Sequence, residues 1–427
     1  MHVLTDHRVH SGGSVDDLEN ANWGQEIEDV MTNILDRKRS SVQGREEAYA
    51  AYCALSKFQY VHDRVFNRVN DLVGAFCKSI KLESSEREST LALRALELLA
   101  VSAYDATIFE NVEPVLTRTI RDSTSEAVKS TAIHCLGTCA VFGGAGEDGM
   151  LDQMNFLLDI VASDGESVGA SGAAEPVAAA LAEWGHLATF VDDLAAESEE
   201  AIQIFADQLN CNDSVIQIAA GEAIALLYEK SYSPYVDDGS DDSDAEEEED
   251  DSDHGDDEGE EALLSYNGPK LVKRYDAYHN TPELVRELQS LATAHSKRIS
   301  KRDKKSLHQS FVSIQTTVED PRRGPMYSTA IDSETGRHYG SRFSVKVGRD
   351  GVMYVDRWWK WVRLNAMRRL FQGGFAAQYY RGNRSMLESL PSVEHRPAQA
   401  HAEQGRKRTG RRGDTRRFAI HDQSDGE

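Results

Sequence analysis

Apolar residues recur at helical spacing through most of the first half of the chain. The first stripe consists of Ile27, Val30, Met31, Ile34 and Leu35. Comparable stripes follow at about 44–58, 60–80, 88–104, 108–120, 125–142, 150–162, 174–189, 192–209 and 213–231. Short polar segments join the stripes, and no convincing alternating strand pattern precedes residue 340. The pattern predicts a domain built almost entirely of α-helices.

Four of these helices resemble one another. They can be aligned on Leu96, Leu136, Leu181 and Leu226, which lie 40, 45 and 45 residues apart. Repeats of this length are typical of armadillo and HEAT proteins, in which each helical unit buries its apolar face against its neighbours. A plain helical bundle is the alternative, because the internal identity between the units is weak. The regular spacing favours an armadillo/HEAT-like α-solenoid.

An acidic stretch interrupts this pattern. Residues 233–262 hold 17 Asp or Glu and no Lys or Arg, so we expect a solvated, disordered insertion rather than a calcium loop. Helical patterns return at 282–296 and 300–318. The sequence therefore predicts a disordered N-terminus over 1–23 and a repeat domain over 24–318 that contains the insertion.

A different pattern begins after the last helical repeat. Phe343, Val345 and Val347 alternate with polar residues, and Val352 and Tyr354 do the same beyond a Gly/Asp turn, which predicts a β-hairpin. A helix beginning WWKWVRLNAMRRLF follows. We predict a small basic α+β domain over 319–390 and a disordered basic tail over 391–427, attached to an otherwise all-α fold.

Charge changes sign along the chain. From Lys297 to the end there are 27 Lys or Arg against 14 Asp or Glu, although the whole chain carries a formal net charge of −25. A cationic third of this kind favours a polyanionic partner. The segment 357–384 combines seven Lys or Arg with seven aromatic residues and no acid. Cations neutralise phosphates, and aromatic rings stack on unpaired bases.

The alternative interpretation of this segment is structural, with the aromatic residues in a small core and the cations on a solvated face. We favour core positions for most of Trp358, Trp359 and Trp361, and polyanion contact for the cations, because no carboxylate lies near them in sequence. The predicted RNA- or ribosome-binding residues are Arg357, Lys360, Arg363, Arg368, Arg369, Arg381, Arg384, Arg406, Lys407, Arg408, Arg411 and Arg412.

Other motifs are weaker. A second basic cluster is a possible import signal, formed by Lys297, Arg298, Lys301, Arg302, Lys304 and Lys305. Ser243 and Ser424 each have an acid three residues later, which allows phosphorylation by acid-directed kinases. His134, Cys135 and Cys139 share one helix and fit buried packing better than metal binding.

Several classes of protein are disfavoured. No apolar run is long enough to span a membrane, no signal peptide is expected, and the five cysteines suit a reducing compartment. The segment GGAGEDG (143–149) fits a turn and not a phosphate loop. We find no nucleophile–base pair and therefore predict no enzyme activity, no cofactor, no metal and no small-molecule substrate.

Two parts of the chain resemble a known family. ILDRKRSSVQGREEAYAAYCALSKFQY (34–60) is similar to the opening helices of the interferon-related developmental regulator family. SKRDKKSLHQSFVSIQTTVED (300–320) and RFSVKVGRDGVMYVDRWWKWVRLNAMRRLFQGGFAAQYYRGNRSML (342–387) resemble its C-terminal domain, as in a fungal-like or otherwise divergent member. The resemblance implies an armadillo-like domain and a non-catalytic regulator. It also implies a link either to transcriptional co-regulation through deacetylase-containing corepressors or to ribosome binding that silences translation.

Two functions remain open from the sequence. The first is a translational regulator that binds ribosomes or RNA through its basic C-terminal region and proteins through its repeats. The second is a nuclear co-regulator that assembles a histone-deacetylase corepressor complex, with the basic runs as import signals. A transport adaptor lacks the expected Trp/Asn ladder. Both main hypotheses place the protein in the cytoplasm, the nucleus or both.

Overall fold

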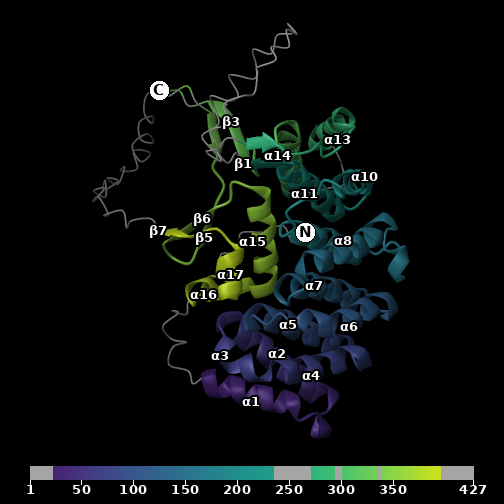
Figure 1. The fold of residues 1–427 in the computed structure, drawn as a ribbon, viewed down its shortest axis with the longest axis vertical. Helices are drawn as coiled ribbons and strands as arrows, with labels where there is room; N and C mark the ends of the chain where they lie inside the picture. The colour runs from purple at the N-terminus through teal and green to yellow at the C-terminus, as the bar shows by residue number, and fades with distance from the viewer. Residues whose placement is uncertain are drawn as a thin grey trace, which may run out of the picture.

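The computed structural model describes residues 23–234, 271–293, 301–331, 333, 336 and 338–395. Predictions made for residues 1–22, 235–270 and 396–427 lie outside this part of the chain. Within it, stacked helices form a solenoid, and a small module of strands and helices lies against its side (Figure 1). The predicted fold class is confirmed.

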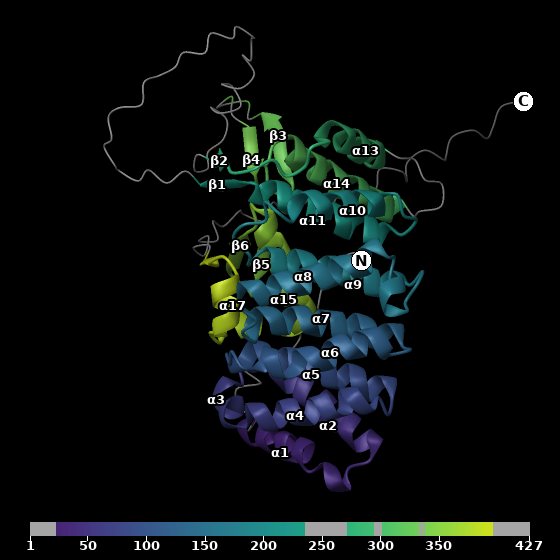
Figure 2. The ribbon, with the colours of Figure 1, turned by 45° about the vertical axis from the view of Figure 1, so that its right-hand side comes forward.

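The helices of the solenoid form successive tiers (Figure 2). In chain order they are α1 (Trp23–Leu35), α2 (Val42–Phe58), α3 (His62–Val65), α4 (Val69–Leu82), α5 (Glu86–Ala103), α6 (Ile108–Asp122), α7 (Glu126–Phe142), α8 (Gly146–Ala162), α9 (Ala174–Ala188), α10 (Ser198–Leu209), α11 (Ser214–Lys230), α13 (Thr281–Thr293) and α14 (Lys301–Glu319). Two predicted helices need correction. The stripe at 60–80 is split by a 3-10 turn, η3 (Phe66–Arg68), and the helix expected from 192 begins at Ser198.

The tiers form two layers. Helices α2, α5, α7, α9, α11 and α14 pack side by side as an inner row, and α4, α6, α8 and α10 cover that row from outside. The four leucines that aligned the repeats all lie in the inner row and are at most 1% exposed. The repeat spacing therefore identified the helices that form the core.

Polar residues set where the inner helices begin. The side chains of Ser41, Ser85, Ser125 and Asp213 accept hydrogen bonds from backbone N–H groups in the first turns of α2, α5, α7 and α11. Such caps satisfy donors that the helix itself leaves unpaired. The cap recurs at four of the five inner helices from α2 to α11, the exception being α9, which follows Ala173.

The helical stack continues past the acidic segment. Strand β1 (Tyr232–Pro234) pairs antiparallel with β2 (Leu271–Lys273), so the two ends of the intervening segment lie side by side. Helices α13 and α14 follow, and α14 packs on α11. These strands, with β3 (Tyr327–Ile331) and β4 (His338–Ser341), were not expected before residue 340.

The C-terminal module contains the predicted hairpin, formed by β5 (Ser344–Val347) and β6 (Gly351–Tyr354). A third strand, β7 (Glu394–His395), pairs with β6 inside the stretch predicted as tail. Between them come α15 (Trp358–Phe371), a turn η5 (Gln372–Gly374), α16 (Phe375–Tyr380) and α17 (Arg384–Ser389). Figure 1 shows α15 upright beside the tiers, with α16 and α17 at its lower end.

Candidate functional site

Helix α15 carries four of the predicted polyanion-binding cations, and it packs across the inner row of the solenoid. It contacts α5, α9 and α11 directly. None of its fourteen residues is exposed, and Trp358, Leu364, Met367, Leu370 and Phe371 are buried. The chain therefore covers its own inner surface with this helix.

A carboxylate of the solenoid binds the N-terminal end of α15. Glu229 of α11 accepts hydrogen bonds from the backbone N–H groups of Trp358, at 2.7 Å, and Trp359, at 3.1 Å. An acid at this position also complements the positive end of the helix dipole. Burial raises the pKa of Glu229 to about 7, against the opposing effect of Arg357 and the two N–H groups. The Trp358 indole donates to Thr317 of α14, which fixes the same end of the helix.

Arg363 anchors the middle of α15. Its guanidinium lies 3.7 Å from the centre of the Phe190 ring and donates to the hydroxyl and the carbonyl of Thr189, at 2.9 and 2.6 Å. Burial lowers the pKa of Arg363 to about 10. This arginine is therefore held between aromatic and carbonyl groups of the protein itself.

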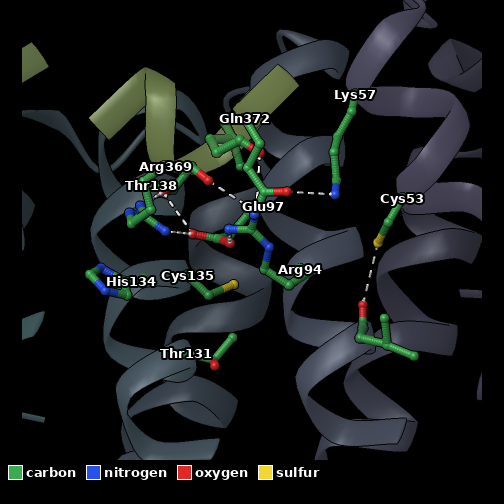
Figure 3. Close-up of polar contacts among 12 residues, drawn as sticks. Cys53, Lys57, Arg94, Glu97, Thr131, His134, Cys135, Thr138, Arg369 and Gln372 are labelled. Atoms are coloured by element: carbon green, nitrogen blue, oxygen red, sulfur yellow. Dashed lines mark hydrogen bonds and ion pairs between the residues drawn. The ribbon is translucent and has the colours of Figure 1, made fainter. Parts of the chain in front are cut away.

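The C-terminal end of α15 is held by buried ion pairs (Figure 3). Arg369 donates to Glu97 of α5 at 2.6 Å and to Glu183 of α9 at 3.0 Å, and it reaches Thr138 of α7 at 3.2 Å. Arg94 of α5 donates to the last carbonyls of α15, those of Arg369 and Leu370. Arg369 of α15 and Arg94 of α5 thus join α15 to three successive inner helices, α5, α7 and α9.

The two glutamates in this cluster are almost fully buried, with side chains 0% and 2% exposed. Burial raises the pKa of each carboxyl, but Arg369 together with Arg94 and His134 at Glu97, and together with His134 and His186 at Glu183, outweighs it, so the pKa of both glutamates is lowered. Burial and Arg369 together lower the pKa of His134, which lies 2.7 Å from Glu183. Gly137 makes room for the cluster, because a Cβ there would lie 2.3 Å from a Glu183 oxygen.

These contacts correct one premise of the sequence analysis. Carboxylates pair with the cations of α15 both from nearby in sequence, as Asp356 does with Lys360, and from distant helices, because folding brings α5 and α9 against it. Lys360 pairs with Asp356, Arg384 pairs with Glu388 and stacks on Tyr104, Arg368 stacks on Phe375, and Arg357 reaches the carbonyl of Arg322. Arg381 is half-buried at the end of α16. Polyanion binding by these residues stays a prediction.

Arg406, Lys407, Arg408, Arg411, Arg412, Lys297, Arg298, Ser243 and Ser424 lie outside the described residues, as do the side chains of Lys301, Arg302, Lys304 and Lys305. Trp358 is buried, while Trp359 and Trp361 are half-buried and pack against the core. The three rings line the interior, as the core interpretation expected.

Sequence reasoning missed three exposed cations of the module, which lie on β5 and in the loops before and after it. Arg342, Lys346 and Arg349 are exposed, and within the described part of the chain no carboxylate lies within ion-pair distance of them. It also missed Glu97 and Glu183. Each of these acids stands in a largely apolar helical run, LALRALELLA and AAALAEWGHLA, and that pattern is the signal of a buried acid with a cationic partner.

Other kinds of site are not supported in the described residues. No group of three or more His, Cys, Asp or Glu side chains there is arranged to hold a metal ion. No helix among them combines the length and apolar character needed to cross a bilayer. A surface hollow of about 710 Å³ between α4 and α6 is lined partly by Val73, Cys77, Lys78 and Asn111, without a catalytic pair.

The architecture defines a helical-repeat scaffold whose inner face is covered by its own basic C-terminal module. A sequence model of the interferon-related developmental regulator family matches residues 3–319, and the chain belongs to this family. Membership supports a regulatory, non-enzymatic role. The chain is also 24% identical over 366 residues to an uncharacterized protein of Schizosaccharomyces pombe, covering 84% of this chain and 72% of that relative.

Proposed function

We propose that this protein regulates gene expression without catalysis, by binding ribosomes or RNA through its basic C-terminal region and thereby repressing translation. The observation that carries the proposal is the exposure of Arg342, Lys346 and Arg349 on a chain whose formal net charge is −25. Cations that are not paired within the described chain release counterions when they meet phosphates, which favours binding to a polyanion. In this proposal these cations are the part of the C-terminal module that contacts RNA.

The helical repeats supply the second half of the proposed function, which is binding to regulatory proteins. Helix α15 covers the inner row, so an inner-face partner of the repeats meets an occupied surface. Within the described residues, the outer layer of α4, α6, α8 and α10 is the part of the solenoid that the C-terminal module does not cover, and we assign protein binding to it. A protein working on ribosomes acts in the cytoplasm, whereas corepressor assembly requires the nucleus.

The test is co-sedimentation of the full-length protein with purified ribosomes through a sucrose gradient, with and without ribonuclease. The variant Lys346→Glu/Arg349→Glu reverses two exposed charges and should lose most of the ribosome-bound fraction. Each phosphate contact removed should also lower the slope of log affinity against log salt by about 0.7 to 0.9. The matched control, Lys78→Glu/Lys81→Glu, changes the same charge on the exposed surface of α4 and should co-sediment like the wild type.

A second variant, Arg411→Glu/Arg412→Glu, tests the contribution of the basic tail in the same assay. If the hairpin and tail variants both co-sediment unchanged, RNA binding by the C-terminal region is wrong. A nuclear corepressor scaffold then becomes the better proposal.

A further inference from the structure

Strands β3 and β4 form a separate two-stranded hairpin at the upper end of the molecule (Figure 1). Its base is fixed to α14, because Ser313 accepts a hydrogen bond from the Met326 N–H at 2.8 Å and Thr317 donates to the Arg323 carbonyl at 2.6 Å. Gly324 lets the chain pass directly against the Asp356 carbonyl, where a Cβ would lie 1.8 Å from that oxygen. The base of the hairpin is therefore rigidly attached while its strands project outward.

Two arginine–tyrosine stacks lie on this hairpin. The Arg342 guanidinium carbon is 4.0 Å from the centre of the Tyr339 ring, and that of Arg323 is 5.6 Å from Tyr327. Tyr327 pairs across the hairpin with Ser341, two positions from Tyr339. The stacks therefore occupy neighbouring positions of one small sheet.

The stack of Arg342 on Tyr339 faces solvent. Tyr339 is 39% exposed and Arg342 is exposed, as are Met326 at 52% and Ile331 at 62%. Arg323 shares Asp320 with Arg322. Arg342, in contrast, has no carboxylate of the described residues within ion-pair distance. An exposed pair of this kind contributes little to the core, so its ring and its charge are available to a binding partner.

We propose that the Tyr339–Arg342 stack binds unpaired bases of single-stranded RNA. The inference rests on the proposed function and names the class of nucleic acid and the residues that recognise it. An aromatic ring and a guanidinium plane both stack on bases, while the charge of Arg342 also attracts the phosphates. Duplex RNA offers no free base faces, so it fits this surface poorly.

A protein strand is the competing occupant of the hairpin. The pairing of β3 with β4 shifts register between Ser328 and Ile331, which interrupts the regular row of backbone groups that strand addition requires. A cation stacked on a ring also has no role in strand addition. Single-stranded RNA is therefore the occupant to which the proposal commits.

The experiment measures binding of the full-length protein to a fluorescein-labelled single-stranded RNA, and to the same sequence as a duplex, by fluorescence anisotropy. Tyr339→Ala should weaken single-strand binding by roughly 5- to 100-fold, the range of base–aromatic stacking. It should leave duplex binding unchanged. Tyr339→Phe keeps the ring and should bind like the wild type. Melting temperatures of both variants verify the fold, since Tyr339 is exposed.

The outcomes separate this inference from the proposed function. If Lys346→Glu/Arg349→Glu abolishes RNA binding and Tyr339→Ala has no effect, the cationic surface stands and the stacking site is wrong. Equal losses for Tyr339→Ala on single-stranded and duplex RNA also overturn base stacking. If the wild type binds neither RNA nor ribosomes, the proposed function itself fails. A selective loss in Tyr339→Ala that Tyr339→Phe does not share supports the site.

Discussion

Helix α15 and the two hairpins beside it belong to the same basic module, but they place their cations in opposite environments. Arg369 of α15 is paired with two buried carboxylates, and Arg363 lies against an aromatic ring. Arg342, Lys346 and Arg349, on β5 and in the loops before and after it, are exposed, and none of them pairs with a carboxylate of the described chain. In sequence, α15 has the stronger nucleic-acid signature, with four cations and three tryptophans among its first twelve residues.

The difference shows that cationic residues with interleaved aromatics have two distinct physical uses. Where acids of neighbouring helices converge on them, they join one element to another inside the protein. Where such residues are surrounded by solvent and loop backbone, their charges and rings remain available to a partner. Buried pairs such as Arg369–Glu97 add little net stability compared with apolar packing, but they allow only one docked position of the helix.

The largest effect is expected on removing the cation from the buried cluster. Arg369→Ala leaves Glu97 and Glu183 buried without their main partner, and breaking a buried pair in this way costs about 3–5 kcal/mol. Arg349→Ala, the matched control on the hairpin, should change the stability by less than about 0.5 kcal/mol. Urea unfolding followed by tryptophan fluorescence measures both, since three of the tryptophans lie in α15. Equal midpoints for the two variants would contradict the comparison.

The two ends of α15 should respond oppositely to pH. The pKa of Glu229 is raised to about 7, so its contribution to stability is complete below its unfolded pKa and is lost as the pH rises through 7. The pKa of Glu97 is lowered, so its contribution is present above its unfolded pKa and is lost as the pH falls through its folded pKa.

Between roughly pH 5 and pH 8 the free energy of unfolding of the wild type should therefore fall by up to about 3 kcal/mol relative to that of Glu229→Gln. The difference in free energy of unfolding between the wild type and Glu97→Gln should show no such decrease, and Glu97→Gln should be the less stable protein throughout this range. Melting curves of the three proteins across the range measure both differences. Parallel curves for wild type and Glu229→Gln would show that Glu229 does not titrate there.

The smallest effect is expected from deleting the acidic residues 237–261. The paired strands β1 and β2 bring the ends of this segment together, with Pro234 opposite Leu271, so a short linker can replace it without moving any helix. The melting temperature should change by less than about 2 °C, a limit that corresponds to roughly 1 kcal/mol at this size. A larger decrease would mean that these carboxylates stabilise the fold, as Glu97 and Glu183 do for α15.

Much of the fold could be predicted because it depends on local and repetitive signals. The spacing of Leu96, Leu136, Leu181 and Leu226 identified the inner helices, and the alternation around Val345 and Val352 located the β5–β6 hairpin. Strands β1 to β4 escaped prediction because short strands carry few alternating positions. Their pairing is decided by where α11, α14 and the module bring them together.

The sequence by itself determined the helical repeats, the reversal of charge and the cationic, aromatic character of the C-terminal third. Each of these follows from composition or periodicity, which do not depend on what lies nearby in space. Only the tertiary structure decided which cations are available to a partner. Arg369 and Arg349 are chemically identical, but the first meets carboxylates from helices 186 and 272 residues away along the chain, while the second meets solvent. Availability of a charge is a property of its surroundings, and contacts over such distances leave no local trace in the sequence.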